Sequence, residues 1–154
     1  MKFNKTFLAL AAVAAAVIIG CGTILQGHDP LIVRVEQAET MAADTFDTVL
    51  RLDSVNRPFW RTNAPEFHSF CEWLRETQTV TFRLRSTNAP GGFVTRTAIA
   101  TRSSAMIIDL NETKLDYRSG KASSNTLWGV LTAVNSALAR ASDWATRLAP
   151  PSRQ

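Results

Sequence analysis

The strongest periodic pattern in the chain lies in residues 123–149, SSNTLWGVLTAVNSALARASDWATRLA. Apolar residues recur there at intervals of three and four, a spacing that places them on one face of an α-helix. They are Leu127, Val130, Leu131, Val134, Leu138, Ala141, Ala145 and Leu148. Ser123 or Ser124 suits the helix N-cap, and Pro150-Pro151 ends the helix. A helix with one apolar face needs partners to cover that face, and the preceding segments are candidates.

A long helix is also predicted at residues 30–56. Asp29 and Pro30 suit the N-cap and the first helical position, and Arg57-Pro58 ends the pattern. Its apolar residues have helical spacing: Ile32, Val35, Ala42, Phe46, Val49 and Leu50. Acidic residues lie between these apolar positions: Glu36, Glu39, Asp44, Asp47 and Asp53. The segment is therefore interpreted as an acidic amphipathic helix.

Asn63-Ala64-Pro65-Glu66 is interpreted as the cap and start of a shorter helix, with Glu66 three residues after Asn63 as in a capping box. The stripe of this helix is formed by Phe67, Phe70, Cys71 and Leu74. Its continuation is ambiguous, because residues 79–85, TVTFRLR, alternate as in a β-strand and also carry Leu84 in helical phase. A single strand without a partner would leave its backbone edges unpaired. We therefore expect helix in this segment.

The clearest break in the chain is NAPGG at residues 88–92. A further helix is predicted at 94–118, closed by Ser119-Gly120. Its stripe consists of Val94, Ala98, Thr101, Ala105, Ile108 and Leu115. The sequence thus predicts an all-α fold, an antiparallel up-and-down bundle of about four helices in one domain at residues 29–149, with a tail at 150–154.

The first residues have the layout of a secretory signal. Lys2 and Lys5 precede an apolar run from Phe7 to Ile19, and Gly20 stands before Cys21. The sequence Ile18-Ile19-Gly20-Cys21 resembles the lipobox of bacterial lipoproteins. This resemblance implies a signal peptide at 1–20 that is cleaved after Gly20, lipid attachment at Cys21, and a tether at 21–28 behind the signal or anchor helix. With glycine at position 22, it also implies the periplasmic side of the outer membrane if the host is Gram-negative.

The alternative is that residues 7–25 remain in the membrane as an uncleaved signal anchor, although this run is marginal for a span of roughly 20 apolar residues. Both readings place the domain outside the cytoplasm. The chain also resembles small helical lipoproteins of unknown function from bacteria and phages, through Asp29-Pro30, the segment at 44–47 and the alanine-rich last helix. That resemblance implies no activity.

Composition argues against a nucleic-acid protein. The chain has 17 basic and 13 acidic residues, and removal of residues 1–20 takes two lysines away to leave 15 basic residues. Arg51, Arg75, Arg102 and Arg140 are scattered over four segments, whereas nucleic-acid binding requires clustered basic residues. No small-molecule substrate or cofactor is indicated. If Cys21 carries lipid, Cys71 is the one free thiol left in the chain, and we expect it to be buried.

Few residues form a pattern with catalytic meaning. His68 and Cys71 are three apart and could hold a metal or form a thiolate–base pair, but two groups make no site, so no metal is expected. Activity dependent on His68 or Cys71 would indicate an enzyme, the least favoured class. Asp109, Glu112 and Asp116, with Lys114 and Arg118 among them, are interpreted as a salt-bridged surface.

Trp73 stands off its helix stripe and is a candidate interface residue. The sequence therefore favours a non-enzymatic, lipid-anchored cell-envelope protein that acts through contacts with another envelope protein. The alternative is a membrane-spanning accessory protein with a retained signal anchor, of the kind used in phage lysis or superinfection exclusion.

Overall fold

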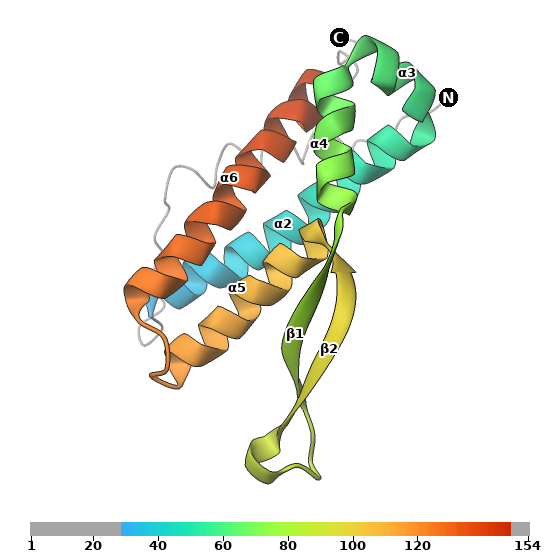
Figure 1. Cartoon of the computed structure of the whole chain (residues 1–154). Helices are drawn as coiled ribbons and strands as arrows, with labels where there is room; N and C mark the ends of the chain where they lie inside the picture. Colours follow the sequence, from blue (N-terminus) through green and yellow to red (C-terminus); the bar gives the residue numbers. More distant parts are fainter. Residues whose placement is uncertain (1–28, 149–154) are drawn as a thin grey trace, which may run out of the picture.

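A computed structural model describes residues 29–148 (Figure 1). The predicted signal peptide at 1–20 with its cleavage position Gly20, the lipidation site Cys21, the tether at 21–28 and the tail at 150–154 lie outside the described residues. The described part contains five α-helices and a two-stranded sheet. Among residues 29–148, no helix combines the length and apolarity that a membrane-spanning segment needs.

Three long helices form the body of the molecule: α2 (Pro30–Val55), α5 (Arg102–Arg118) and α6 (Ser124–Leu148). In Figure 1, α5 runs against the direction of α2, and α6 returns beside both. The predicted stripes of the first and last helices are confirmed, because Val35, Phe46, Val49, Leu127 and Leu131 lie in the core. Burying these apolar faces against each other is the main stabilisation of the helices.

Two shorter helices close one end of the body. α3 (Arg57–Asn63) turns the chain after α2, and α4 (Pro65–Arg75) packs back against α2. The predicted helix with its stripe is confirmed, since α4 begins at Pro65 and Phe67, Phe70, Cys71 and Leu74 are buried. The predicted capping box is wrong, because Asn63 ends α3 and the N-cap of α4 is Ala64, with no side-chain hydrogen bond. Trp60 of α3 donates its indole N–H to the Leu52 carbonyl at 3.0 Å, which fixes the turn between α2 and α3.

The prediction of an all-α fold is wrong, because β1 (Thr77–Arg85) and β2 (Phe93–Thr101) form an antiparallel hairpin. A short 3-10 turn, η1 (Pro90–Gly92), lies in the connecting loop, where Gly91 and Gly92 have positive φ values of 79° and 74° that suit glycine. The predicted break at 88–92 is therefore the turn of a hairpin. The strand at 77–85 does have a partner, which the helical interpretation of 94–101 had concealed.

The predicted helix at 94–118 is correspondingly too long, since α5 begins at Arg102. Val94 and Ala98 had seemed to continue its stripe, but they belong to a strand of alternating, β-branched residues. Of the predicted stripe, Ala105 is buried as expected, but the second buried apolar residue of α5 is Leu110, and the predicted Ile108 and Leu115 are only partly buried. Thr101 is the N-cap of α5, and its hydroxyl accepts a hydrogen bond from the Ser104 N–H at 3.4 Å.

The hairpin, including its loop, is here called the arm (residues 77–101). The arm leaves the body where α4 ends and α5 begins, and it projects beyond the lower end of α5 (Figure 1). No residue of the arm is buried, and none belongs to the hydrophobic core. The body and the arm are therefore stabilised by different means.

Candidate functional site

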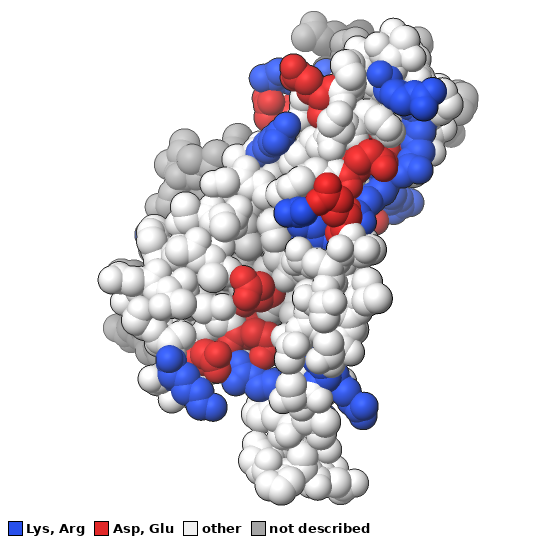
Figure 2. All heavy atoms as spheres, in the orientation of Figure 1, with Lys and Arg blue, Asp and Glu red and all other residues white. Residues whose placement is uncertain are grey.

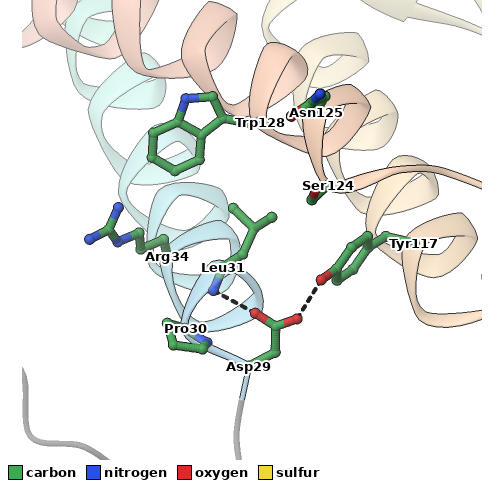
Figure 3. A pocket seen from close by; sticks show the side chains of 8 residues that line it. All are labelled: Asp29, Pro30, Leu31, Arg34, Tyr117, Ser124, Asn125 and Trp128. Carbon is green, nitrogen blue, oxygen red and sulfur yellow. Dashed lines mark hydrogen bonds between the residues drawn. The ribbon is translucent and has the colours of Figure 1, made fainter.

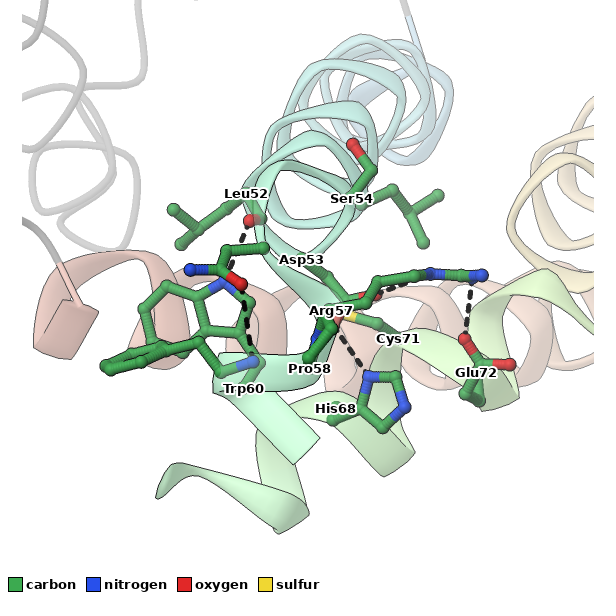
Figure 4. Close-up of polar contacts among 12 residues, drawn as sticks. Leu52, Asp53, Ser54, Arg57, Pro58, Trp60, His68, Cys71 and Glu72 are labelled. Carbon is green, nitrogen blue, oxygen red and sulfur yellow. Dashed lines mark hydrogen bonds and ion pairs between the residues drawn. The ribbon is translucent and has the colours of Figure 1, made fainter. Parts of the chain in front are cut away.

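The molecule has two main candidate functional sites. One is a cluster of charged side chains at the corner of α2, α3 and α4, and the other is the arm. The first is the Asp53 cluster, made of Asp53, Arg57, His68, Glu72 and Arg75 (Figure 4). It contains the one group of three potential metal ligands that the described residues bring together, Asp53, His68 and Glu72, whose ligand atoms lie within 4.8 Å of one another.

Asp53 is at the centre of this cluster and has no exposed surface. Its Oδ1 lies 2.8 Å from Nδ1 of His68, and its Oδ2 accepts a hydrogen bond from the Arg75 guanidinium. Arg57 Nε lies 3.5 Å from the same Oδ2. The carboxylate of α2 thus joins α3 and α4, and Figure 4 shows the three elements meeting around it.

Glu72 completes the cluster from the solvent side. Its Oε1 lies 2.8 Å from a guanidinium nitrogen of Arg57 and 2.8 Å from one of Arg75. Arg75 also donates to the Leu50 carbonyl at 2.9 Å. Two guanidinium groups therefore occupy the positions next to both carboxylates, and their positive charge opposes a divalent cation there. The arrangement is an ion-pair network that fastens a corner of the fold.

The charges in this network shift two pKa values. Burial is the largest single effect on Asp53 and raises the pKa of its carboxyl group. The hydrogen bonds from His68 and Arg75 and the charge of Arg75 together lower the pKa by more than burial raises it, so the pKa lies below the usual value. Burial by itself would lower the pKa of Arg75, and the hydrogen bond and charge of Asp53 raise it overall. Both groups are held in their charged forms.

Cys71 is not part of this chemistry. The predicted burial of its thiol is confirmed, and its Sγ lies 3.6 Å from the Val49 carbonyl oxygen, to which the thiol donates. Burial, with the nearby negative charge of Asp53, raises the pKa of Cys71 to about 12, which keeps the thiol protonated and unreactive. The predicted neighbours His68 and Cys71 therefore do not act as a pair, because His68 faces Asp53.

Asp53 itself was missed as a core residue. It was interpreted as one of the acidic residues between the apolar positions of the first helix. A signal was present, since Asp53 follows Phe46 by seven residues and Val49 by four, so it continues their helical face. Its partners come from α3 and α4, and only the tertiary structure brings them to this face.

The predicted acidic surface of 109–116 is only partly a solvated surface. Asp109 is exposed, but Glu112 and Asp116 face the arm and bind Arg83 of β1. The Arg83 guanidinium lies 2.6 Å from Glu112 Oε2 and 2.8 Å from Asp116 Oδ1. This contact raises the pKa of Arg83, chiefly through the hydrogen bond to Glu112. These acids hold the near half of the arm against α5.

The cations predicted on the same helix are also paired with other elements. Lys114 is buried and its Nζ lies 2.6 Å from Glu39 of α2, while Arg118 lies 2.9 Å from Glu36. These pairs join α5 to α2. Glu112, Asp116, Lys114 and Arg118 of α5 therefore all join this helix to other structural elements.

Trp73, the predicted interface residue, lies beside the junction of α4 and the arm. Its ring stacks on Phe70 with centroids 5.7 Å apart, and the Arg102 guanidinium lies 4.9 Å from its centroid. Arg102 in turn pairs with Glu76, which immediately precedes β1. Trp73 is half-buried, so part of the ring is exposed. Its role at an interface stays a prediction.

A shallow groove of about 450 Å³ lies where α2 begins (Figure 3). Asp29 accepts hydrogen bonds from the Leu31 N–H at 2.8 Å and from the Tyr117 hydroxyl at 2.6 Å. The Tyr117 hydrogen bond lowers the pKa of Asp29. Trp128 is 48 % exposed, with Arg34 5.6 Å from its ring centroid. The hydrogen bond between Asp29 and Tyr117 joins the start of α2 to α5.

The arm has the opposite character, because it exposes large apolar side chains. Ile99 is 77 % exposed, Leu84 48 % and Phe93 39 %. Residues 77–101 contain no Asp or Glu, and their basic residues are Arg83, Arg85 and Arg96. On the face in Figure 2, the far end of the arm carries no charged side chain. A two-stranded hairpin is marginally stable alone, so an exposed arm of this kind suits a contact with another molecule.

No protein-family model matches this chain, and neither the search of curated proteins nor the search of solved structures found a match.

Proposed function

We propose that this chain is a non-enzymatic protein of the cell envelope, held at a membrane by lipid on Cys21, that acts by binding another protein through its arm. The observation that carries the proposal is the arm itself, a hairpin of nine opposed residue pairs in which no residue is buried and three large apolar side chains are exposed. A projecting hairpin that exposes large apolar side chains next to cationic residues, and that is covered by nothing in the described part of the chain, is a candidate binding element.

The Asp53 cluster supports a non-enzymatic role. Its two carboxylates have the residue types of an active site, but Asp53 is buried, and both Asp53 and Glu72 are bound to Arg57 and Arg75. A metal must find ligands without competing cations, and a carboxylate that acts as a general base must be able to reach a substrate proton. The two guanidinium groups oppose both roles for these carboxylates.

The attachment to a membrane rests on the sequence Ile18-Ile19-Gly20-Cys21. The mature protein in the membrane fraction should have an intact mass equal to residues 21–154 plus acyl groups. The variant Cys21→Ala should lose the acyl groups and remain unprocessed. A wild-type mass equal to the whole chain, unaffected by this substitution, would instead support the retained signal anchor.

The role of the arm is tested by a shortened variant in which residues 79–99 are replaced by Asn-Gly. Gln78 and Ala100 are opposed in the hairpin, and Asn-Gly is the dipeptide preferred in a two-residue hairpin turn. No removed residue is buried, but the pairs of Arg83 with Glu112 and Asp116 are lost, so the midpoint of thermal unfolding should shift by no more than about 10 °C.

The full chain and the shortened variant are then compared in pull-downs from detergent-solubilised envelopes of the native host. We expect a protein that is retained by the wild type and lost with the shortened variant, although that variant remains folded. Retention of the same proteins by both chains would show that the arm is not the binding element and would refute the proposed function.

A further inference from the structure

The two outer edges of the hairpin can be distinguished from its register. Beyond the two ends of the ladder, the Ser86 N–H donates to the Gly92 carbonyl at 2.9 Å and the Arg102 N–H donates to the Glu76 carbonyl at 2.7 Å. Both of these hydrogen-bonded pairs join even-numbered residues, and they continue the register of the ladder. Opposed pairs in an antiparallel ladder alternate between hydrogen-bonded and non-hydrogen-bonded pairs, so all the even-numbered pairs are hydrogen-bonded. The odd-numbered residues therefore direct their backbone N–H and C=O groups away from the partner strand.

The outer edge of β1 is partly covered by the body. The N–H of Arg83, an odd-numbered residue, points outward and donates to Glu112 Oε1 at 2.9 Å. The side chain of Arg83 binds the same carboxylate and the Glu112 carbonyl. α5 thus supplies the hydrogen-bond acceptor for the outward N–H in the middle part of the β1 edge, so another strand could not pair along the whole of that edge.

The outer edge of β2 is open. Its outward N–H and C=O groups belong to Phe93, Thr95, Thr97 and Ile99, and all four residues are exposed. Within residues 29–148, no hydrogen bond from another element reaches these backbone groups. In Figure 1, β2 forms the side of the arm that faces away from α5. Four donors and four acceptors are therefore available in a row.

Apart from the charge of Arg96, this edge lacks the features that usually prevent strand pairing. β2 contains no proline and no lysine, and its nine residues pair with β1 without a bulge. Its sequence, FVTRTAIAT, is rich in β-branched residues, which favour an extended backbone. A long, regular and unprotected edge is a template for addition of another strand.

The charges on the arm select the kind of strand. Arg85 and Arg96 form no ion pair with any described residue, and no acid is present between 77 and 101. If two copies of β2 paired about Thr97, their Arg96 side chains would lie within two positions of each other, with no carboxylate between them. Such like-charge pairing is unfavourable, whereas a carboxylate opposite Arg96 is favourable.

We propose that the open edge of β2 binds an extended segment of another protein, adding a third antiparallel or parallel strand, with an acidic side chain opposite Arg96. This proposal rests on the arm being the binding element, and it names the partner's chemistry. On the face of β2 that carries Arg96, the residues on either side of it are Val94 and Ala98, so apolar residues should flank the acidic one at alternate positions of the bound segment. A lipid surface could meet the exposed apolar residues, but it cannot continue a backbone ladder.

The test uses the full chain in detergent micelles and a phage-displayed library of random peptides as long as β2. We expect selected peptides to alternate β-branched or apolar residues with Asp or Glu. Their affinity should fall about tenfold in Thr97→Pro, which removes an outward N–H from the β2 edge but none of the hairpin bonds. Arg96→Glu should weaken binding similarly, and Arg96→Lys should restore most of it.

Thr81→Pro is the matched control. Thr81 lies directly opposite Thr97, is equally exposed, and also directs its N–H outward, but to the β1 edge. Its hydroxyl lies 3.4 Å from that of Thr97, so both substitutions remove the same side-chain contact. Peptide affinity should therefore stay unchanged in Thr81→Pro. Amide hydrogen exchange should also slow at Thr95, Thr97 and Ile99 when peptide binds.

Several results would overturn the proposal. The library could yield no selected sequence, or peptides without acidic residues, or peptides that bind Thr97→Pro as tightly as the wild type. The full chain could also dimerise through the arm, or the arm could bind phosphatidylglycerol vesicles in place of peptides. The shortened arm separates the two proposals. If shortening abolishes retention of the envelope protein while Thr97→Pro does not, the arm is the binding element but strand addition is wrong.

Discussion

Two regions of the molecule differ in which side chains they bury: the Asp53 cluster buries a charged group, whereas the arm exposes apolar ones. At the corner, a carboxylate is completely buried and is held by His68 and Arg75 from another helix. On the arm, Ile99 is largely exposed and Arg96 pairs with nothing in the described residues. The corner therefore uses groups typical of active sites to hold the fold, whereas the arm leaves groups typical of a protein core available for binding.

The largest effect should come from Asp53→Ala. This substitution leaves the Arg75 guanidinium without its buried carboxylate, and removal of one partner of a buried pair costs about 3–5 kcal/mol. Urea denaturation of the full chain measures the change in the free energy of unfolding. The control is Asp47→Ala, whose exposed pair with Arg51 should contribute about 0.5 kcal/mol or less. Equal losses in the two variants would contradict a structural role for the corner.

The same substitution in the two regions should have unequal effects. Leu74→Ala removes a fully buried side chain from the core and should cost about 2–5 kcal/mol, whereas Leu84→Ala on the arm should change stability by about 0.5 kcal/mol or less. Chemical denaturation measures both. The arm variant should instead weaken retention of the envelope protein. A large loss of stability in Leu84→Ala would show that the arm is part of the core.

A smaller effect is expected from acid. The pKa of Asp53 is lower in the folded chain than in the unfolded chain, so its contribution to stability is fully present above the unfolded value near 3.8 and is lost as the pH falls through the folded value. The free energy of unfolding should therefore decrease as the pH falls below about 4. Asp53→Asn should show a shallower decrease. Parallel pH profiles for the two proteins would argue against this carboxylate as the source.

The elements with long periodic patterns could be predicted from the sequence, and the hairpin could not. The helices at 30–55 and 124–148 were predicted closely, because their apolar residues repeat over several turns and their ends carry capping residues and prolines. The hairpin was missed because the apolar residues of each strand also fit a helical spacing, and each strand is supported only by its pairing with the other. Val94, Ala98 and Thr101 happened to match the helical spacing of the residues that follow, and the true partner of 77–85 was assigned to that helix.

The candidate sites show the same division. The burial of Cys71 followed from its place in an apolar stripe, and the structure confirms it. Asp53 also stood in a stripe position, but its stabilising partners lie 15 and 22 residues away on another helix. Arg83 gave no signal of its attachment to Glu112, because that contact exists only when the hairpin folds beside α5.

The sequence by itself determined the helical body, since amphipathic periodicity and helix ends are local properties of the chain. The lipobox at 18–21 is likewise a local pattern, and the lipid attachment that it indicates remains a prediction. Only the tertiary structure decided that 77–101 forms an arm, that Asp53 belongs to the core and that the edge of β2 is open. Strand pairing and burial depend on residues far apart in the sequence, so their outcome is fixed only when the chain has folded.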